Sequence, residues 1–295
     1  MTGLGQVITA MVTPFTRDLE VDYDRAVQLA QRLVADGSDG LVVCGTTGEA
    51  PTLSEDERLR LMATVVDAVG DRVPVIAGTG TNNTAAACAF TKKAEATGAT
   101  AILSVTPYYN KPPQAGLYEH FRHVAGSTRL PVVLYNVPGR TGVNMLPETV
   151  LRLARDVPNI VAVKEASGSV EQAARIAREA PPGFRVLCGD DALTLPMLAV
   201  GGSGVVSVAS HLVAGRLRQM IAAFARGDVA AAQRVHLELL PLFAALFLTA
   251  NPIPVKRALE LAGFPVGGPR LPLVPAGEAE TAALVAAMRP LGLLA

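Results

Sequence analysis

The sequence predicts an α/β fold, a (β/α)₈ barrel with a C-terminal helical appendage. Eight short runs are rich in Val, Ile and Ala without polar alternation, which is typical of parallel strands covered on both faces. The runs begin at intervals of roughly 20 to 35 residues, with amphipathic stretches between most of them. Such barrels need about 250 residues, so a chain of 295 residues has room for one barrel and a further segment.

The elements follow one another in a βα order. The eight predicted strands lie in VITAMVTP, GLVVCGTT, VPVIAGTG, ATAILSVTP, PVVLYNVP, IVAVKEA, FRVLCGDD and GVVSVAS. Helices are expected at 22–35, 54–69 and 147–156, and Ser54 with Glu57 three residues later forms a capping-box signal. An open doubly wound sheet is the alternative fold, but no G-x-G-x-x-G follows the first run.

Two domains are expected along the chain. The barrel should occupy residues 1–226, by its typical length of about 250 residues. Residues 227–295 are rich in Ala and Leu and contain the breaks NPIPV and GFPVGGPRLPLVP. We therefore expect a C-terminal helical domain there.

Composition narrows the class of protein. Lys plus Arg and Asp plus Glu both number 26, and this zero net charge argues against binding to nucleic acid or to an anionic membrane. The N-terminal stretch has no basic region, and no apolar run is long enough to span a bilayer. Three widely spaced cysteines suit a reduced compartment. The prediction is a cytoplasmic globular protein.

Unusual residues gather where the predicted strands end, which is where barrel enzymes place their active sites. The second run closes on GTTGE, the fourth on TPYYNKP and the fifth on YNVPGRTG. The sixth contains Lys164, the seventh ends in CGDD, and the eighth is GVVSVAS.

Lys164 is the only one of five lysines that falls within an apolar run. Lys92 and Lys93 are expected to face solvent, Lys111 lies in a Pro-rich loop, and Lys256 begins a C-terminal helix. Burial disfavours the charged amine and leaves more of the neutral form, which attacks carbonyl carbons to give a Schiff base. The alternative is a structural lysine paired with Glu165, although adjacent strand residues point to opposite faces.

Each of the other motifs also has a structural interpretation. GTTGE can aim backbone N–H groups at a carboxylate, but Thr and Gly are common in turns. The tyrosines of TPYYNKP can pass protons through a Tyr–Thr chain, or simply pack in a loop or interface. Arg140 can clamp a carboxylate or lie in solvent. Asp190 and Asp191 are expected to cap a helix or hold a loop, and the four histidines to be structural.

In chain order, GTTGE, YYNKP, YNVPGRTG and KEASG resemble the dihydrodipicolinate synthase family, within the pyruvate-dependent class I aldolases. The resemblance runs from AMVTPF through GVVSVAS and continues into NPIPVK, so it covers nearly the whole chain. It implies a lyase of the diaminopimelate route to lysine, which condenses pyruvate with L-aspartate 4-semialdehyde. It also implies a covalent imine on the protein with no metal or organic cofactor.

The resemblance implies four catalytic residues. Lys164 would form the imine with pyruvate, and Tyr135 would donate and accept protons. Thr46 would link Tyr135 to Tyr109, which would reach in from a neighbouring subunit. Family members are usually homotetramers, built as dimers of dimers.

The resemblance also implies the substrate contacts. Thr47 would hold the pyruvate carboxylate, while Gly189 and Val206 would line the site. Arg140 would receive the carboxylate of the semialdehyde. Sialic acid aldolases and keto-deoxy sugar acid enzymes are sister alternatives, and a non-catalytic pyruvate-binding regulator is another. Arg140 and the intact GTTGE favour the synthase, and the complete catalytic set argues against the regulator.

One departure concerns regulation by lysine. Where lysine-inhibited members carry histidines and a glutamate, this chain has Glu55, Arg58 and Ala86, while Asn82 and Tyr108 are kept. Without a carboxylate at Ala86, the ammonium group of lysine lacks a partner, so feedback inhibition is predicted to be weak or absent.

Overall fold

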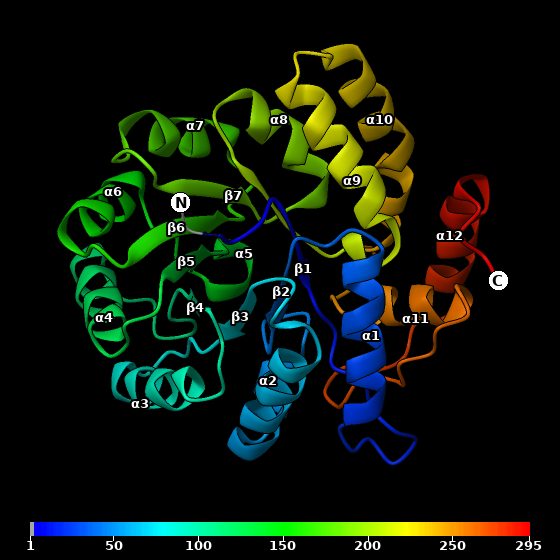
Figure 1. Cartoon of the computed structure of the whole chain (residues 1–295), viewed down its shortest axis with the longest axis horizontal. Coiled ribbons are helices and arrows are strands. Elements are labelled where there is room, and N and C mark those ends of the chain that lie inside the picture. Colours follow the sequence, from blue (N-terminus) through cyan, green and yellow to red (C-terminus); the bar gives the residue numbers. More distant parts are fainter. Residues whose placement is uncertain (1–2) are drawn as a thin grey trace.

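A closed barrel of eight parallel strands lies at the centre of the molecule, which confirms the predicted fold class (Figure 1). The computed structural model describes residues 3–295. The strands are paired in sequence order and β1 closes on β8. Their bounds are β1 Val7–Ala10, β2 Gly40–Val43, β3 Val75–Gly78, β4 Ala101–Val105, β5 Val132–Asn136, β6 Ile160–Glu165, β7 Arg185–Cys188 and β8 Gly204–Ser207.

Helices surround this barrel and continue into the C-terminal part of the chain (Figure 1). The α-helices are α1 Tyr23–Ala35, α2 Glu55–Val69, α3 Thr84–Glu95, α4 Gln114–Gly126, α5 Pro138–Thr141, α6 Pro147–Asp156, α7 Val170–Glu179, α8 Thr194–Ala199, α9 Ser210–Ala225, α10 Val229–Ala245, α11 Ile253–Leu261 and α12 Glu278–Met288. Short 3₁₀ turns are η1 Ala50–Thr52, η2 Asp191–Leu193 and η3 Arg289–Leu291.

Local sequence signals explain where the predicted helices begin. Ser54 accepts a hydrogen bond from the Glu57 amide, and the Glu57 side chain accepts one from Ser54 N–H, so the predicted capping box is present. Asp22 caps α1 in the same way by accepting from Arg25 N–H. Pro147 opens α6, where a missing N–H costs nothing.

Alternation along the strands divides the core into two layers. One apolar cluster fills the barrel itself and includes Ile8, Val42, Ile76, Val133 and Leu187. A larger cluster fills the space between the strands and the surrounding helices. Side chains on both faces of every strand are therefore buried, which is why the runs carry no polar alternation.

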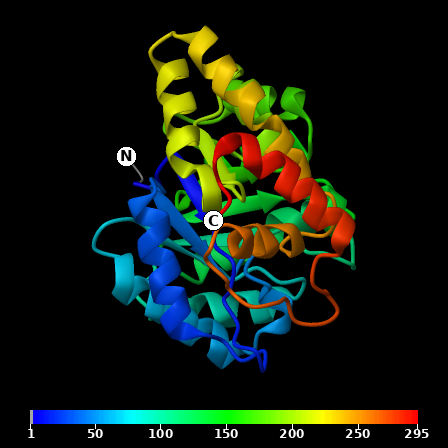
Figure 2. The same cartoon turned by 90° about the vertical axis from the view of Figure 1, so that its right-hand side faces the viewer.

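The C-terminal helices lie on one side of the barrel. Helix α10 packs along α9, and α12 packs against α10 and α11. Figure 2 shows α11 and α12 in front of the barrel on the side of α1 and α9. The predicted boundary near residue 226 falls between α9 and α10. Residues 1 and 2, which belong to the predicted barrel domain, lie outside the described residues.

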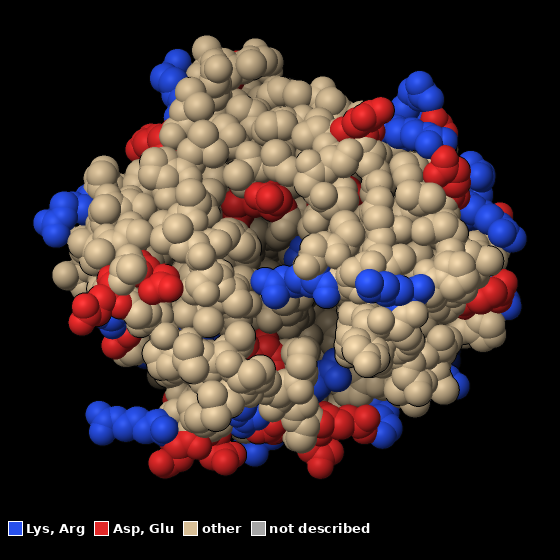
Figure 3. Space-filling view, turned by 180° about the vertical axis from the view of Figure 1, so that it is seen from behind, with Lys and Arg blue, Asp and Glu red and all other residues tan. Residues whose placement is uncertain are grey.

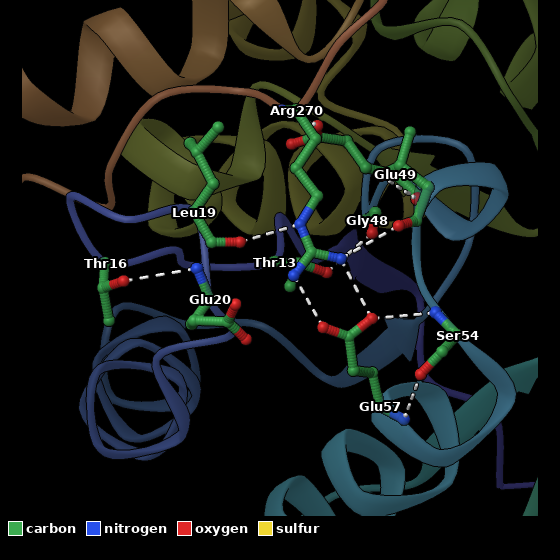
Figure 4. A network of polar contacts seen from close by, with 10 residues as sticks. Thr13, Thr16, Leu19, Glu20, Gly48, Glu49, Ser54, Glu57 and Arg270 are labelled. Carbon is green, nitrogen blue, oxygen red and sulfur yellow. Dashed lines mark hydrogen bonds and ion pairs between the residues drawn. The ribbon is translucent and has the colours of Figure 1, made fainter.

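The segment after α11 is tied to the loop that follows β2. Arg270 forms a two-pronged ion pair with Glu57, and its guanidinium also donates to the carbonyl oxygens of Leu19 and Thr52. The amide of Arg270 donates to the carboxylate of Glu49 (Figure 4). The end of the chain thus holds a loop more than two hundred residues away in sequence.

Lys256 is buried, which the sequence analysis did not anticipate for a lysine at the start of a helix. Its ammonium lies 2.6 Å from a carboxylate oxygen of Glu49, and both side chains are almost fully enclosed. The apolar packing of α11 against the barrel covers this side chain, and the carboxylate compensates the charge.

None of the helices in the described part of the chain combines the length and the apolar character needed to cross a membrane.

Candidate active site

Lys164 lies inside the barrel near the carboxyl end of β6, with only 6% of its surface exposed. Strand pairing sets it directly beside Tyr135 of β5 and Leu187 of β7. Its ammonium nitrogen sits 4.1 Å from the centre of the Tyr135 ring. Within residues 3–295 this ammonium forms neither an ion pair nor a hydrogen bond. The side chain is therefore a buried amine without a compensating carboxylate.

The carboxylate of Glu165 points away from Lys164, which rules out the structural pair considered above. It accepts hydrogen bonds from the side chains of Asn136 and Gln172 and from Ser167 N–H. These donors occupy both oxygens of the carboxylate on the outer face of the barrel. Because successive residues of β6 point to opposite faces, Lys164 faces the inside of the barrel and is separated from the Glu165 carboxylate.

The GTTGE loop presents unused hydrogen-bond donors. The amides of Gly48 and Glu49 donate back to the carbonyls of Gly45 and Thr46, which closes the turn. The amides of Thr46 and Thr47 have no acceptor among the described residues. Two adjacent free N–H groups in a tight turn form a small concavity that suits an anion such as a carboxylate.

Thr47 is buried and its hydroxyl oxygen accepts a hydrogen bond of 2.9 Å from the side-chain amide of Asn251. Asn251 precedes α11 and is separated from Thr47 by 204 residues in sequence. No local pattern marks Asn251 as a site residue, because only the tertiary packing of the C-terminal segment brings it to this loop. Its presence in the NPIPVK motif was the only available signal.

A cavity of about 290 Å³ opens next to the GTTGE loop and Tyr135. Among the predicted site residues, Thr46, Tyr135 and Arg140 line it, and Arg58 and Tyr108 contribute further side chains. The lining does not include the other predicted site residues Lys164, Thr47, Gly189, Val206 and Tyr109. Viewed from the side opposite to Figure 1, the surface is hollowed near its middle, with charged side chains at the edge (Figure 3). A cavity of this size accommodates small polar metabolites.

Arg140 belongs to α5, directly after β5, and its side chain is exposed. Within the described residues its guanidinium forms no ion pair. An unpaired guanidinium at the border of a cavity is suited to bind a carboxylate through two parallel hydrogen bonds.

Gly189 and Val206 approach the site from β7 and β8. A side chain at Gly189 would place its Cβ 3.1 Å from Cε of Lys164 and 2.6 Å from Cβ of Ala166, so only glycine fits there. Val206 is buried in the apolar cluster inside the barrel, which also contains Tyr135. These two residues therefore lie close to the base of the site.

Tyr109 is 88% exposed and adopts φ 74°, a backbone conformation that is unfavourable for an aromatic residue. Its amide donates to Thr141 O, and its ring is not part of the cavity lining. The hydroxyl groups of Thr46 and Tyr135 have no hydrogen-bond partner within residues 3–295. A single chain thus places Thr46 and Tyr135 together but does not connect them to Tyr109.

The other candidate groups have structural roles. Asp190 accepts from Ala192 N–H at the start of η2, and Asp191 accepts from Ser207 and from the amides of Val208 and Ala209. This confirms the expected capping and loop-holding. Burial raises the pKa of the Cys44 and Cys188 thiols to about 12, so neither supplies a thiolate near neutral pH.

The histidines are not gathered into a metal site. Burial lowers the pKa of His120 and of His211 to about 4, so both rings are neutral at physiological pH. His211 accepts from Val12 N–H and contacts the carbonyl of Val208, which links the ends of β1 and β8. No group of three metal-binding side chains occurs in the described part of the chain.

Known proteins of one name resemble this chain over its full length. The chain is 58% identical over 295 residues to a 4-hydroxy-tetrahydrodipicolinate synthase of Thermosynechococcus vestitus, which covers 100% of this chain and 99% of the relative. It is 59% identical over 294 residues to the enzyme of that name from Symbiobacterium thermophilum, with 100% of both chains covered.

Solved structures agree with these sequences. The dihydrodipicolinate synthase of Cyanidioschyzon merolae, solved with lysine bound, matches with a TM-score of 0.98 and 50% identity, and 100% of each chain is covered. The chloride-inhibited enzyme of Acinetobacter baumannii, solved with pyruvate, matches with a TM-score of 0.95 and 37% identity, covering 99% of this chain and 100% of the other. The sequence model of the dihydrodipicolinate synthetase family matches residues 3–290, and the chain belongs to that family.

Proposed function

We propose that this chain condenses pyruvate with L-aspartate 4-semialdehyde to give 4-hydroxy-tetrahydrodipicolinate, the activity for which its relatives are named. The chain is thus an enzyme of the lyase class in the diaminopimelate route to lysine. The observation that carries the proposal is Lys164, a buried amine without a carboxylate partner that lies against the ring of Tyr135. Such an amine is suited to form a Schiff base with a ketone.

The reaction proceeds by covalent catalysis on Lys164. The neutral amine attacks C2 of pyruvate, and the carbonyl oxygen leaves as water to give an imine. Loss of a proton from C3 produces an enamine, whose carbon attacks the aldehyde of the second substrate. The amine of that substrate then adds to C2 and displaces Lys164, so the cyclic product leaves and the lysine is regenerated.

Two groups of donors hold the substrate carboxylates. The free amides of Thr46 and Thr47, together with the Thr47 hydroxyl, receive the carboxylate of pyruvate. Arg140 receives the carboxylate of the semialdehyde at the border of the cavity. Gly189 leaves room beside Lys164, and Val206 contacts the pyruvate from β8.

Tyr135 moves protons during imine formation and the aldol step, through Thr46 and the Tyr109 of a neighbouring subunit. The exposure and unfavourable φ of Tyr109 support this role, because a strained backbone at an exposed aromatic residue requires compensation from elsewhere. A role for Tyr109 across an interface requires at least a homodimer. The proposed assembly is a tetramer built as a dimer of dimers, as the family resemblance implies.

The remaining features follow from the same proposal. The chemistry runs on the protein-bound imine and needs no metal or organic cofactor, and the enzyme acts in the cytoplasm. Residues 227–295 form a helical domain that supports the loop after β2, through contacts such as the Lys256–Glu49 pair.

Feedback inhibition by lysine is weak or absent in this chain, although a relative from Cyanidioschyzon merolae binds lysine. Glu55 is paired with Lys93, and Arg58 lies over the Phe90 ring and donates to Gly78 O. These side chains are already engaged, and Ala86 offers no carboxylate. Half-inhibition at low lysine concentration in a steady-state assay would contradict this proposal.

The central test is turnover with pyruvate and L-aspartate 4-semialdehyde, compared with pyruvate and N-acetylmannosamine or glyoxylate, for wild type and Lys164→Ala. We expect turnover with the semialdehyde alone, and its loss in the variant. Preference for another aldehyde would retain the Schiff-base mechanism and move the chain to a sister activity. Wild-type turnover by Lys164→Ala would refute the mechanism.

A further inference from the structure

The C-terminal segment contributes one side chain to the loop that is proposed to hold pyruvate. Asn251 is 6% exposed, Thr47 is 3% exposed, and the amide nitrogen of Asn251 donates to the hydroxyl oxygen of Thr47 at 2.9 Å. The hydroxyl of Thr47 has no acceptor of its own within residues 3–295. A buried hydroxyl therefore keeps its hydrogen available.

The direction of this hydrogen bond determines what the hydroxyl can do. A threonine hydroxyl has one hydrogen to donate and two lone pairs to accept with. The amide of Asn251 occupies a lone pair, so rotation of the hydroxyl toward Asn251 as a donor is not favoured. The hydrogen is then free for an acceptor outside the chain, as are the backbone amides of Thr46 and Thr47.

We propose that Asn251 is a positioning residue for the carboxylate of the ketoacid substrate, acting through the hydroxyl of Thr47. The site so formed offers the carboxylate three hydrogen-bond donors: two backbone amides and one hydroxyl. This inference rests on the proposed binding of pyruvate at the GTTGE loop. It adds that a residue of the C-terminal domain makes the Thr47 hydroxyl a hydrogen-bond donor toward the substrate.

The neighbouring contacts keep the Asn251–Thr47 pair in place. Glu49, two residues after Thr47, is held by the ammonium of Lys256 and by the amide of Arg270. Asn251 is thus one of several contacts between the C-terminal segment and the loop. It is the one among them that touches a proposed ligand-binding side chain.

The test is borohydride trapping of the pyruvate imine, followed by mass spectrometry of the intact protein over a series of pyruvate concentrations. This readout needs no aldehyde. The variants are Asn251→Ala, which removes the donor, Asn251→Asp, which has nearly the same shape but only accepts, and Thr47→Val. Asn159→Ala is the matched control, because the side-chain amide of Asn159 donates to backbone carbonyls away from the site.

We expect Asn251→Ala to raise the half-saturating pyruvate concentration about threefold to tenfold, as for one lost hydrogen bond. Asn251→Asp should raise it by roughly a further tenfold, because its carboxylate takes the Thr47 hydrogen and repels the ketoacid. The Asn159→Ala control should leave the value unchanged. In the Thr47→Val background, Asn251→Ala should have no further effect, since it acts through the missing hydroxyl.

Three results separate the possibilities. If wild type forms no pyruvate imine at all, the proposed function itself fails. If wild type is trapped but Asn251→Ala and Asn251→Asp saturate as wild type does, only the positioning role is overturned. Equal losses in both Thr47 backgrounds would also overturn it. If Asn251→Asp does not fold, Asn251→Ala alone and in the Thr47→Val background still tests the positioning role.

Discussion

Two lysines of this chain are buried to a similar extent but have opposite surroundings. Lys164 is 6% exposed and Lys256 is 3% exposed. Each ammonium lies over an aromatic ring, 4.1 Å from the centre of Tyr135 and 4.2 Å from that of Phe15. Burial and an adjacent ring are therefore common to both, and neither distinguishes a reactive lysine from a structural one.

The two lysines differ in the polar partners of their ammonium groups. Lys256 pairs with Glu49 and donates to Gly268 O, so its charge is compensated. Lys164 has no such partner among the described residues and lies against the ring of Tyr135, which lines the cavity. Removing one member of a buried pair leaves an isolated charge, whereas removing an unpaired buried amine leaves none. The two lysines should therefore respond in opposite ways to the same substitution.

The largest expected effect is on the activity of Lys164→Met. Because the imine cannot form, turnover with pyruvate and the semialdehyde should fall at least about a thousandfold. The free energy of unfolding should stay within about 1 kcal/mol of wild type or rise, since a buried polar group without a partner is replaced by an apolar chain of similar length. Activity assays and urea unfolding of the same preparation measure both. Strong destabilisation with retained activity would reverse the assignment.

Lys256→Met should destabilise the fold by about 3–5 kcal/mol, because Glu49 keeps a buried charge without its partner. The double variant Lys256→Met with Glu49→Gln should recover part of that loss. Urea unfolding midpoints of the four proteins in this cycle give the coupling. Strictly additive losses would show that the pair is not coupled.

Stability as a function of pH sharpens the comparison further. Burial lowers the pKa of Lys256 from 10.5 to about 8, and this desolvation outweighs the raising effect of Glu49. Between these two values the unfolded chain binds more protons than the folded one, so this lysine makes stability rise with pH. Relative to Lys256→Met, wild type should gain roughly 1–3 kcal/mol from pH 8 to 10.5. A constant difference between the two proteins across that range would contradict the lowered pKa.

The smallest effect is expected at an exposed ion pair. Arg216 of α9 pairs with Glu238 of α10, and the two side chains are 35% and 47% exposed. Arg216→Gln should change the free energy of unfolding by less than about 0.5 kcal/mol, because water already screens the charges. A loss comparable to that of Lys256→Met would show that exposure does not separate these pairs.

The sequence by itself determined the barrel and marked Lys164 as a candidate. Apolar runs without alternation predicted every strand, and the Ser54–Glu57 signal predicted the start of α2. Lys164 was recognisable because a lysine within a buried strand is rare and the residue beside it, Glu165, necessarily points outward. These features are local, since each depends on residues within one element.

Tertiary structure alone decided what surrounds those elements. Thr47 and Asn251 are 204 residues apart, and Arg270 and Glu57 are 213 apart, so no local pattern relates them. In the sequence, Lys256 resembles any lysine at the start of a helix. In the folded chain it is buried beside Glu49. Local periodicity encodes the element to which a residue belongs. The partner of a buried polar group depends on how distant elements pack, because desolvation and pairing arise only when the two surfaces meet.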